Sequence, residues 1–277
     1  MTWTLSGFAD EIAPDPHVQI AVLEALGIGH IEVRSAWDTN IVDLTPDQVE
    51  TLAGLLREHG IGTSAVGSPI GKVPSTVDPD EEVARLRRCI EAAHVLGARF
   101  VRIFSFYPPH GGEPADVRDD VLHRMAALAK LAEQEDVVLL HENEKAIYGD
   151  TPQRCVDIIE SVGSPALRAA WDPANFVQVG VARPFTEGYA MLRPYVDYLQ
   201  VKDALSADGA VVPAGEGDGE LEATIAALLA DGYDGFASME PHLAAAHAMG
   251  GFSGPTAFGV ATRAFTRLLE KAGVGYS

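Results

Sequence analysis

The feature of this sequence that most constrains its fold is a regular alternation of short apolar runs with longer segments of helical period. Such alternation is typical of βαβ units, in which the strands are parallel. The predicted strands cover residues 3–8, 30–33, 62–66, 100–104, 137–141, 168–172, 198–201 and 235–239. The predicted helices lie near residues 17–26, 46–59, 79–96, 117–134, 152–161, 184–193, 221–230 and 256–271.

Eight strands, each followed by a helix, predict an α/β protein with a single (β/α)8 TIM barrel, a fold of roughly 250 residues. A doubly wound sheet is the alternative, and it would carry a Gly-rich phosphate loop after the first strand. Residues 7–12 read G-F-A-D-E-I and lack that loop. Because no linker or internal repeat is visible, we expect one domain over residues 1–277, with long loops at 203–220 and 241–255 on the C-terminal face. We expect the first loop to form a small hairpin and turn over the barrel mouth.

The formal net charge of −20 argues against a nucleic-acid partner, because such a surface repels phosphate backbones. No window has the roughly 18 consecutive apolar residues that a membrane span needs. The N-terminus has no basic segment followed by an apolar one, so a cytoplasmic location is expected. Cys89 and Cys155 have no CxxC spacing, and we interpret them as reduced thiols rather than a disulfide.

The run V-V-L-L-H-E-N at residues 137–143 combines a buried-strand pattern with polar residues at its end. An unbroken apolar run suits a strand that is buried on both faces of a parallel sheet. In a TIM barrel, the C-terminal ends of the strands carry the chemistry. Glu142 is therefore the first candidate for a functional residue.

Four predicted strands in the second half each end in a polar residue: Glu142, Asp172, Gln200 and Glu240. For any one of these residues alone, a cap or loop role is the favoured interpretation, and the metal site is favoured only for all four together. Three carboxylates at one barrel mouth would repel one another unless protons or a cation intervene. Carboxylates and an amide oxygen are hard donors, which favours one Mn²⁺ or Mg²⁺ ion, with Zn²⁺ or Co²⁺ possible.

These motifs, taken together, resemble the xylose isomerase-like TIM-barrel superfamily and its sugar phosphate isomerase/epimerase family. The motifs are F-A-D-E-I at 8–12, I-E-V at 31–33, G-S-P-I-G-K at 67–72, H-E-N at 141–143, W-D-P-A-N at 171–175, V-K-D at 201–203 and M-E-P-H at 239–242. Similar enzymes bind one divalent ion through Glu, Asp, His and Glu at the ends of strands five to eight. Those positions match Glu142, Asp172, Gln200 and Glu240, so Gln200 stands where histidine is usual.

The resemblance implies a divalent-metal-dependent isomerase or epimerase of carbohydrate metabolism, acting on a sugar, sugar phosphate or polyol. Such enzymes remove a C–H proton next to a carbonyl and form an enediolate. Glu142 and Glu240 occupy the acid–base positions of similar ketose epimerases. Lys202 is the expected catalytic cation, with an ion pair to Asp203 or Asp172 as the alternative. Because related barrels often pair, a homodimer is also compatible with the sequence.

Further residues are expected to contact substrate or to support the site. The expected substrate-binding residues are Glu32, Arg102, His141, His242 and Ser68. Arg102 could equally form an interior salt bridge with Glu32 or Glu142, the two histidines could be substitute metal ligands, and Ser68 lies in a turn-rich stretch. Asn143 and Asn175 are expected to hold the ligand-bearing loops through hydrogen bonds.

Two other reaction classes are available on the same scaffold. A dehydratase of an inosose-like or dehydroshikimate-like substrate shares the first proton abstraction, so the sequence leaves it open. A hydrolase resembling endonuclease IV would need a histidine-rich trinuclear zinc site. This chain has nine histidines, few of them at strand ends, which disfavours the hydrolase. A carbohydrate-binding protein without catalysis is disfavoured by the presence of Glu142 and Glu240.

Overall fold

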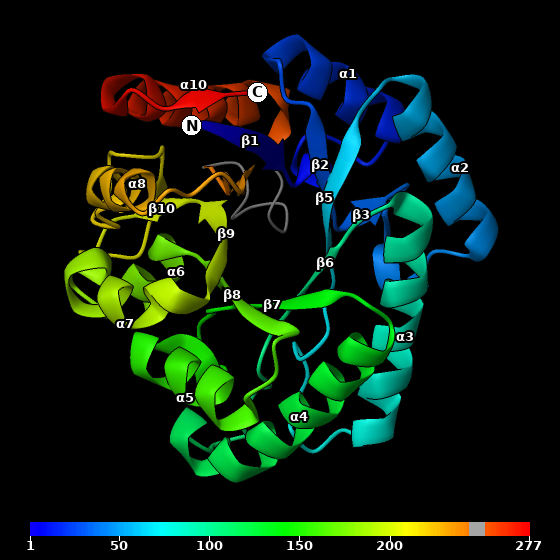
Figure 1. Ribbon diagram of the computed structural model, residues 1–277, viewed down its shortest axis with the longest axis vertical. Coiled ribbons are helices and arrows are strands. Elements are labelled where there is room, and N and C mark those ends of the chain that lie inside the picture. Colours follow the sequence, from blue (N-terminus) through cyan, green and yellow to red (C-terminus); the bar gives the residue numbers. More distant parts are fainter. Residues whose placement is uncertain (244–252) are drawn as a thin grey trace.

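In the computed structural model, which describes residues 1–243 and 253–277, parallel strands form a barrel surrounded by helices (Figure 1). The barrel strands are β1 (Thr2–Gly7), β2 (His30–Val33), β5 (Gly62–Gly67), β6 (Phe100–Ile103), β7 (Val138–Glu142), β8 (Leu167–Trp171), β9 (Val196–Val201) and β12 (Phe236–Met239). The sheet order is β13-β1-β12-β9-β8-β7-β6-β5-β2, where β13 (Gly275–Tyr276) pairs with the start of β1. A parallel bridge between Phe8 and Glu32 joins β1 to β2 and closes the barrel. The predicted TIM-barrel fold is confirmed.

The helices follow the strands in the predicted order. They are α1 (Pro16–Leu26), α2 (Pro46–Glu58), α3 (Pro79–Leu96), α4 (Arg118–Gln134), α5 (Pro152–Val162), α8 (Leu221–Ala230) and α10 (Gly254–Ala272). The start of α2 shows how capping residues determine where a helix begins. The Thr45 side chain and the backbone and side chain of Gln48 form a capping box, and Pro46 occupies the first turn.

The segment between β8 and β9 differs from the prediction. A short helix, α6 (Pro173–Gln178), begins directly after β8 because the Asp172 side chain accepts a hydrogen bond from the Asn175 backbone N–H at 2.9 Å. The predicted helix at 184–193 is a π-helical turn, η5 (Phe185–Tyr189), followed by a short α7 (Ala190–Leu192). The sequence W-D-P-A-N therefore both ends a strand and caps a helix.

The barrel interior changes from apolar to polar along the strands. Ala65, Leu140, Ala170 and Tyr198 form a buried cluster, with Phe100 and Phe236 packed against it. Side chains two residues apart in a strand share a face, so Glu142 follows Leu140 and Gln200 follows Tyr198 into the same interior. The larger core cluster, which includes Trp3, Trp171 and Phe265, is separate from this one.

The predicted loop at 203–220 contains an antiparallel hairpin of β10 (Asp203–Ala204) and β11 (Val211–Val212). The Asp203 carboxylate accepts hydrogen bonds from the backbone N–H groups of Ala204, Gly215, Gly217 and Gly219. This buried carboxylate holds the glycine-rich turn beside Lys202. The other predicted loop, 241–255, lies largely outside the described residues.

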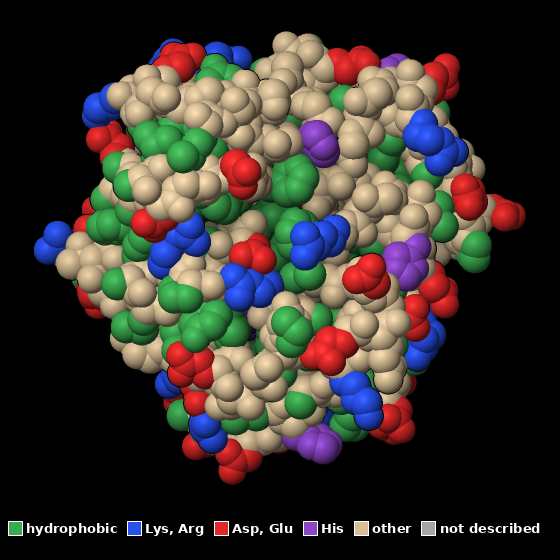
Figure 2. Space-filling model, viewed as in Figure 1, with side chains coloured by type: hydrophobic (Ala, Val, Ile, Leu, Met, Phe, Trp, Pro, Cys, Tyr) green, Lys and Arg blue, Asp and Glu red, His purple; other side chains and the backbone are tan. Residues whose placement is uncertain are grey.

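On the face shown in Figure 2, Lys and Arg side chains lie among Asp and Glu side chains. Within residues 1–243 and 253–277, no helix is long and apolar enough to cross a membrane.

Gly71, in the loop after β5, is a position where only glycine fits. Its φ is +78°, and an added Cβ would overlap the backbone carbonyl of Phe104, whereas Gly60, with φ +66°, has open space around it. We expect Gly60→Ala to lower the free energy of unfolding by about 1 kcal/mol, the strain of a left-handed residue. Gly71→Ala should lower it further, because the clash adds to the strain. Urea unfolding of both variants, followed by circular dichroism, measures the difference, and equal losses would show that the loop absorbs the clash.

Candidate active site at the barrel mouth

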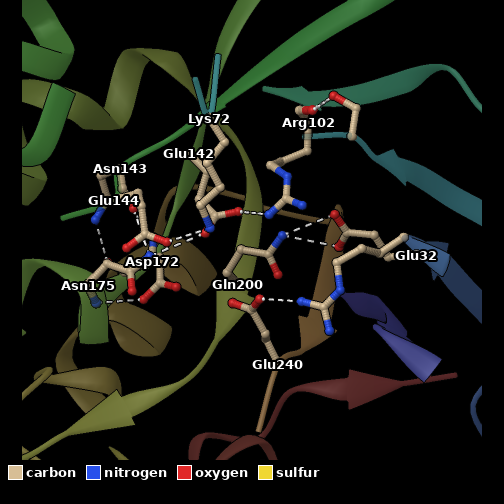
Figure 3. Close-up of polar contacts among 12 residues, drawn as sticks. Glu32, Lys72, Arg102, Glu142, Asn143, Glu144, Asp172, Asn175, Gln200 and Glu240 are labelled. Carbon is tan, nitrogen blue, oxygen red and sulfur yellow. Dashed lines mark hydrogen bonds and ion pairs between the residues drawn. The ribbon is translucent and has the colours of Figure 1, made fainter. Parts of the chain in front are cut away.

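The four polar strand ends converge at one end of the barrel. Glu142, Asp172, Gln200 and Glu240 are all buried, with exposed fractions of 0 to 3%. Carboxylate oxygens of Glu142, Asp172 and Glu240 lie within 4.8 Å of one another (Figure 3). The structure thus brings three acidic groups from three strand ends to one place, as the spacing of the strands predicts.

Lys202 lies at the centre of this acidic cluster. Its Nζ is 2.7 Å from Glu240 Oε2 and 2.8 Å from Asp172 Oδ2. Burial opposes its charge, but Asp172, Glu240 and Glu142 outweigh burial and raise the pKa of Lys202 well above its ordinary value. Lys202 is therefore a fixed ammonium, ion-paired with Asp172 rather than with Asp203.

Arg102 neutralises the third carboxylate. Its Nη1 is 2.6 Å from Glu142 Oε2, and its guanidinium lies over the rings of Phe8 and Phe104. Burial raises the pKa of Glu142 and Arg102 opposes this effect. The interior salt bridge considered for Arg102 is thus present, and the same side chain also lines the cavity at the mouth.

Asn143 and Asn175 link the loops that carry the acidic groups. Asn143 accepts a hydrogen bond from the Asp172 backbone N–H at 3.0 Å and donates one to the Asp172 carbonyl at 2.8 Å. Asn175 Nδ2 donates to the Asn143 carbonyl at 2.8 Å and to Glu142 Oε1 at 3.2 Å. These bonds fix the ends of β7 and β8 relative to each other.

Gln200 is held by Glu32 inside the barrel. Its Nε2 donates to both carboxylate oxygens of Glu32, at 3.2 and 3.1 Å, while its Oε1 has no hydrogen-bond partner among the described residues. Tyr198 also donates to Glu32, at 2.9 Å. Burial raises the pKa of Glu32 to about 7 although Arg102 opposes it. Glu32 is fully buried and is not among the described residues that line the cavity.

A cavity of about 380 Å³ opens beside these groups. Glu240 and Arg102 line it together with His242, which was expected to contact substrate. Arg34, Lys72 and Glu144 also line it and were not among the predicted site residues. Lys72 forms a 2.9 Å ion pair with Glu144 and lies over the Phe104 ring. The accessible side of the acidic cluster is therefore the side on which Glu240 lies.

A second group of charged residues comes from the ends of β1 and β2. Arg34 Nε is 2.7 Å from Asp10 Oδ2, and its Nη1 is 3.1 Å from Glu240 Oε1. Burial raises the pKa of Glu11 to about 8, against the lowering effect of Arg34. The sequence contained a signal for these residues, since F-A-D-E-I follows the first predicted strand and Arg34 follows the second.

The two histidines expected to contact substrate lie in different surroundings. His242 Nε2 is 3.2 Å from Glu11 Oε1, and burial lowers the pKa of His242 to about 4. His141 is buried with its Nε2 3.0 Å from Ser105 Oγ, and burial lowers its pKa to about 3. Because neighbouring strand residues point to opposite faces, His141 lies away from Glu142 and is not among the described cavity-lining residues. Its substrate contact stays a prediction.

Ser68 is also engaged in local structure. Its Oγ donates to the Arg102 carbonyl and accepts from the Ile70 backbone N–H at 3.3 Å. The side chain is fully buried. These bonds fit the turn role considered for Ser68, and its substrate contact stays a prediction.

Several solved structures are similar to this barrel over nearly their whole length. One similar structure is a D-tagatose 3-epimerase-like protein, with 16% identity, a TM-score of 0.78 and 98% of each chain covered. Another is a probable 3-DHS dehydratase from Bacillus anthracis, with 16% identity, a TM-score of 0.75, and 96% of this chain and 99% of that chain covered. A third is a xylose isomerase-like TIM barrel protein from Mycobacterium smegmatis in complex with magnesium, with 21% identity, a TM-score of 0.70, and 98% and 97% covered. At these identities the similarity shows the common fold.

At the level of sequence, no curated protein matches this chain significantly. A family model described as xylose isomerase-like TIM barrel matches residues 20–253. That range includes all four strand ends of the acidic cluster and most of the chain. The chain therefore belongs to the xylose isomerase-like TIM-barrel family.

Proposed function

We propose that this protein is a divalent-metal-dependent isomerase or epimerase that removes a proton from the carbon next to the carbonyl of a sugar, a sugar phosphate or the keto form of a polyol, such as an inosose. The observation that carries the proposal is the set of three buried carboxylates, Glu142, Asp172 and Glu240, with oxygens within 4.8 Å of one another. The family to which the chain belongs and the epimerase-like structural neighbour support this choice.

The charges around the mouth favour a bound cation. Seven acidic side chains lie there against four cationic ones, which leaves three negative charges in excess if all are ionised. The acids are Asp10, Glu11, Glu32, Glu142, Glu144, Asp172 and Glu240, and the cations are Arg34, Lys72, Arg102 and Lys202. Burial raises the pKa of Asp172 to about 7 even beside Lys202. One divalent ion would remove most of this excess.

The donor set also fits a metal ion. Glu142, Asp172 and Glu240 offer carboxylate oxygens, and Gln200 offers an amide oxygen that has no partner among the described residues. All four are hard oxygen donors, so we propose Mn²⁺ or Mg²⁺, with Zn²⁺ or Co²⁺ as weaker choices. Such an ion would act as a Lewis acid that polarises the substrate carbonyl.

The chain's own residues supply the proton transfers. Glu240 borders the cavity, and we assign it the removal of the C–H proton, with the bonding electrons moving toward the carbonyl oxygen. We assign the return of a proton to Glu142, which lies beside Glu240 in the acidic cluster but is not among the described cavity-lining residues. For epimerisation the proton returns to the opposite face of the same carbon. For isomerisation it goes to the former carbonyl carbon, while the hydroxyl proton of the first carbon passes to the former carbonyl oxygen. Lys202 and Arg102 place positive charge beside these carboxylates and stabilise negative charge on the substrate.

A dehydratase is the second candidate. Its first step is the same proton removal, but a hydroxide then leaves the neighbouring carbon and takes up a proton as water. The similarity to a probable 3-DHS dehydratase favours keeping this reaction in the test panel. Among the described cavity-lining residues the only histidine is His242, so a histidine-rich zinc hydrolase is not proposed.

The reaction is tested by loading the protein with Mn²⁺ and incubating it in D₂O with ketoses, aldoses and inososes. Deuterium at one carbon of one substrate identifies both the substrate and the site of proton removal. Glu240→Gln should reduce exchange by about 10²–10⁴-fold, the usual contribution of a general base. Glu222→Gln, an exposed carboxylate paired with Lys271, is the matched control and should exchange normally. Normal exchange by a folded Glu240→Gln protein would remove Glu240 from the mechanism.

Metal choice should respond to the residue at position 200. Gln200→His replaces a hard oxygen donor by an imidazole nitrogen, which Zn²⁺ binds well. We expect the ratio of the Mn²⁺ to the Zn²⁺ dissociation constant to rise in this variant. Competitive titration of the metal-free protein with both ions measures the ratio, and an unchanged ratio would mean that residue 200 is not a ligand.

The excess of buried acid predicts how stability depends on pH. The pKa of Glu11 is about 8 in the folded protein, above its ordinary value of 4.5, so the folded state holds this proton more tightly than the unfolded state. The stability gained from protonated Glu11 is complete below pH 4.5 and is lost as the pH rises through about 8. Between these limits the free energy of unfolding of metal-free protein should fall more steeply in the native protein than in Glu11→Gln. Urea titrations in EDTA at several pH values measure the slopes. Glu222→Gln should keep the native slope, and a native slope in Glu11→Gln would contradict the assignment.

A further inference from the structure

Gln200 stands where similar enzymes have a histidine. An amide ligand must also be correctly oriented, unlike a carboxylate, because only one of its two ends can bind a cation. Its oxygen carries lone pairs that can bind a cation, whereas its NH₂ group only donates hydrogen bonds. Gln200 can therefore serve as a ligand in only one of two orientations. Something in the barrel has to select that orientation.

Glu32 selects the orientation of the Gln200 amide. An ionised carboxylate accepts hydrogen bonds and donates none, so it binds the NH₂ end of an amide and rejects the oxygen end. Both oxygens of Glu32 accept from Gln200 Nε2, at 3.2 and 3.1 Å. The Gln200 oxygen consequently points away from Glu32 toward the side on which Glu240 lies (Figure 3). There it is fully buried and has no hydrogen-bond partner among the described residues, so its lone pairs are free to bind a cation.

Glu32 is itself held in place by groups on the barrel wall. The Tyr198 hydroxyl donates to Glu32 Oε2 at 2.9 Å, and the same hydroxyl is 2.8 Å from Ser64 Oγ. The parallel bridge between Phe8 and Glu32 fixes the backbone where the barrel closes. Burial raises the pKa of Glu32 to about 7, and Arg102, which pairs with Glu142, opposes this rise. The carboxylate is thus a fixed acceptor rather than a mobile one.

We propose that Glu32 is a positioning residue that orients the Gln200 amide, so that its oxygen completes the cation-binding set formed by Glu142, Asp172 and Glu240. The inference rests on the proposed metal-dependent function, and it replaces the substrate contact expected for Glu32. Glu32 is fully buried, binds the NH₂ end of Gln200 and is not among the described residues that line the cavity. Partners that orient metal ligands in this way typically contribute about 10–100-fold to metal affinity.

The first test compares two substitutions that remove the same charge. In Glu32→Gln the new amide can donate as well as accept, so either orientation of Gln200 is satisfied. Glu144→Gln also removes one negative charge near the cavity, but Glu144 pairs with Lys72. Calorimetric titration of metal-free protein with Mn²⁺ should show the dissociation constant rising about 10–100-fold in Glu32→Gln. The rise in Glu144→Gln should be much smaller, and equal rises would overturn the proposal, because charge alone would then explain both.

The second test asks whether Glu32 acts through Gln200. Gln200→Leu has no amide to orient, so adding Glu32→Gln to it should weaken Mn²⁺ binding no more than Glu144→Gln does in the native background. A loss as large as in the native background would show that Glu32 acts by another route and would overturn the proposal. Circular dichroism and thermal unfolding in EDTA confirm that each variant is folded. If the native protein binds no Mn²⁺, the proposed metal site fails and this inference fails with it. If the native protein binds Mn²⁺ and Glu32→Gln binds it equally well, only the inference fails.

Discussion

The repulsion among buried carboxylates at the barrel mouth is the constraint on which the whole site depends. At the observed separation of at most 4.8 Å, two ionised carboxylates repel by about 3 kcal/mol at an effective dielectric constant of about 20. Each carboxylate has a cationic neighbour: Arg102 pairs with Glu142, Arg34 pairs with Glu240, and Lys202 is shared by Asp172 and Glu240. These pairings allow the acids to be buried. Burial still raises the pKa of Glu11, Glu32 and Asp172, and neighbouring carboxylates add to the rise.

Much of this arrangement follows from two periodicities that the sequence displays. The alternation of strands and helices predicts the barrel, and the period of two along a strand predicts that Glu142 shares a face with Leu140. The same period predicts that His141 lies on the opposite face, where its Nε2 contacts Ser105 Oγ. The position of Asp172 was predicted, with a cap role as the alternative, and in the structure Asp172 both joins the acidic cluster and caps α6.

The contacts that other site residues make could not be predicted from local sequence. Asp10 and Glu11 belong to a short 3-10 helix (Ala9–Glu11) after β1, and no strand or helix period sets its path toward Glu240. Arg34 meets Glu240 across 206 positions of the chain, and Gln200 meets Glu32 across 168. Only closure of the barrel between β1 and β2 brings these residues together. The identity of Gln200 as a candidate ligand is local information, whereas the orientation of its amide is set by the tertiary structure.

Lys202 ties the stability of this fold to its proposed chemistry. Its ammonium lies between Asp172 and Glu240, two of the oxygen donors proposed for the cation. A divalent ion bound to the same oxygens would compete with the Lys202 ammonium for Asp172 and Glu240, because each carboxylate carries only one negative charge. Metal binding and the ion pairs of Lys202 are therefore coupled through Asp172 and Glu240: a bound metal ion would weaken the ion pairs, and the ion pairs lower the affinity for the metal ion. A lysine held less tightly by the protein is a better partner for a substrate oxygen, so the same competition that limits metal affinity would make this cation available for the reaction.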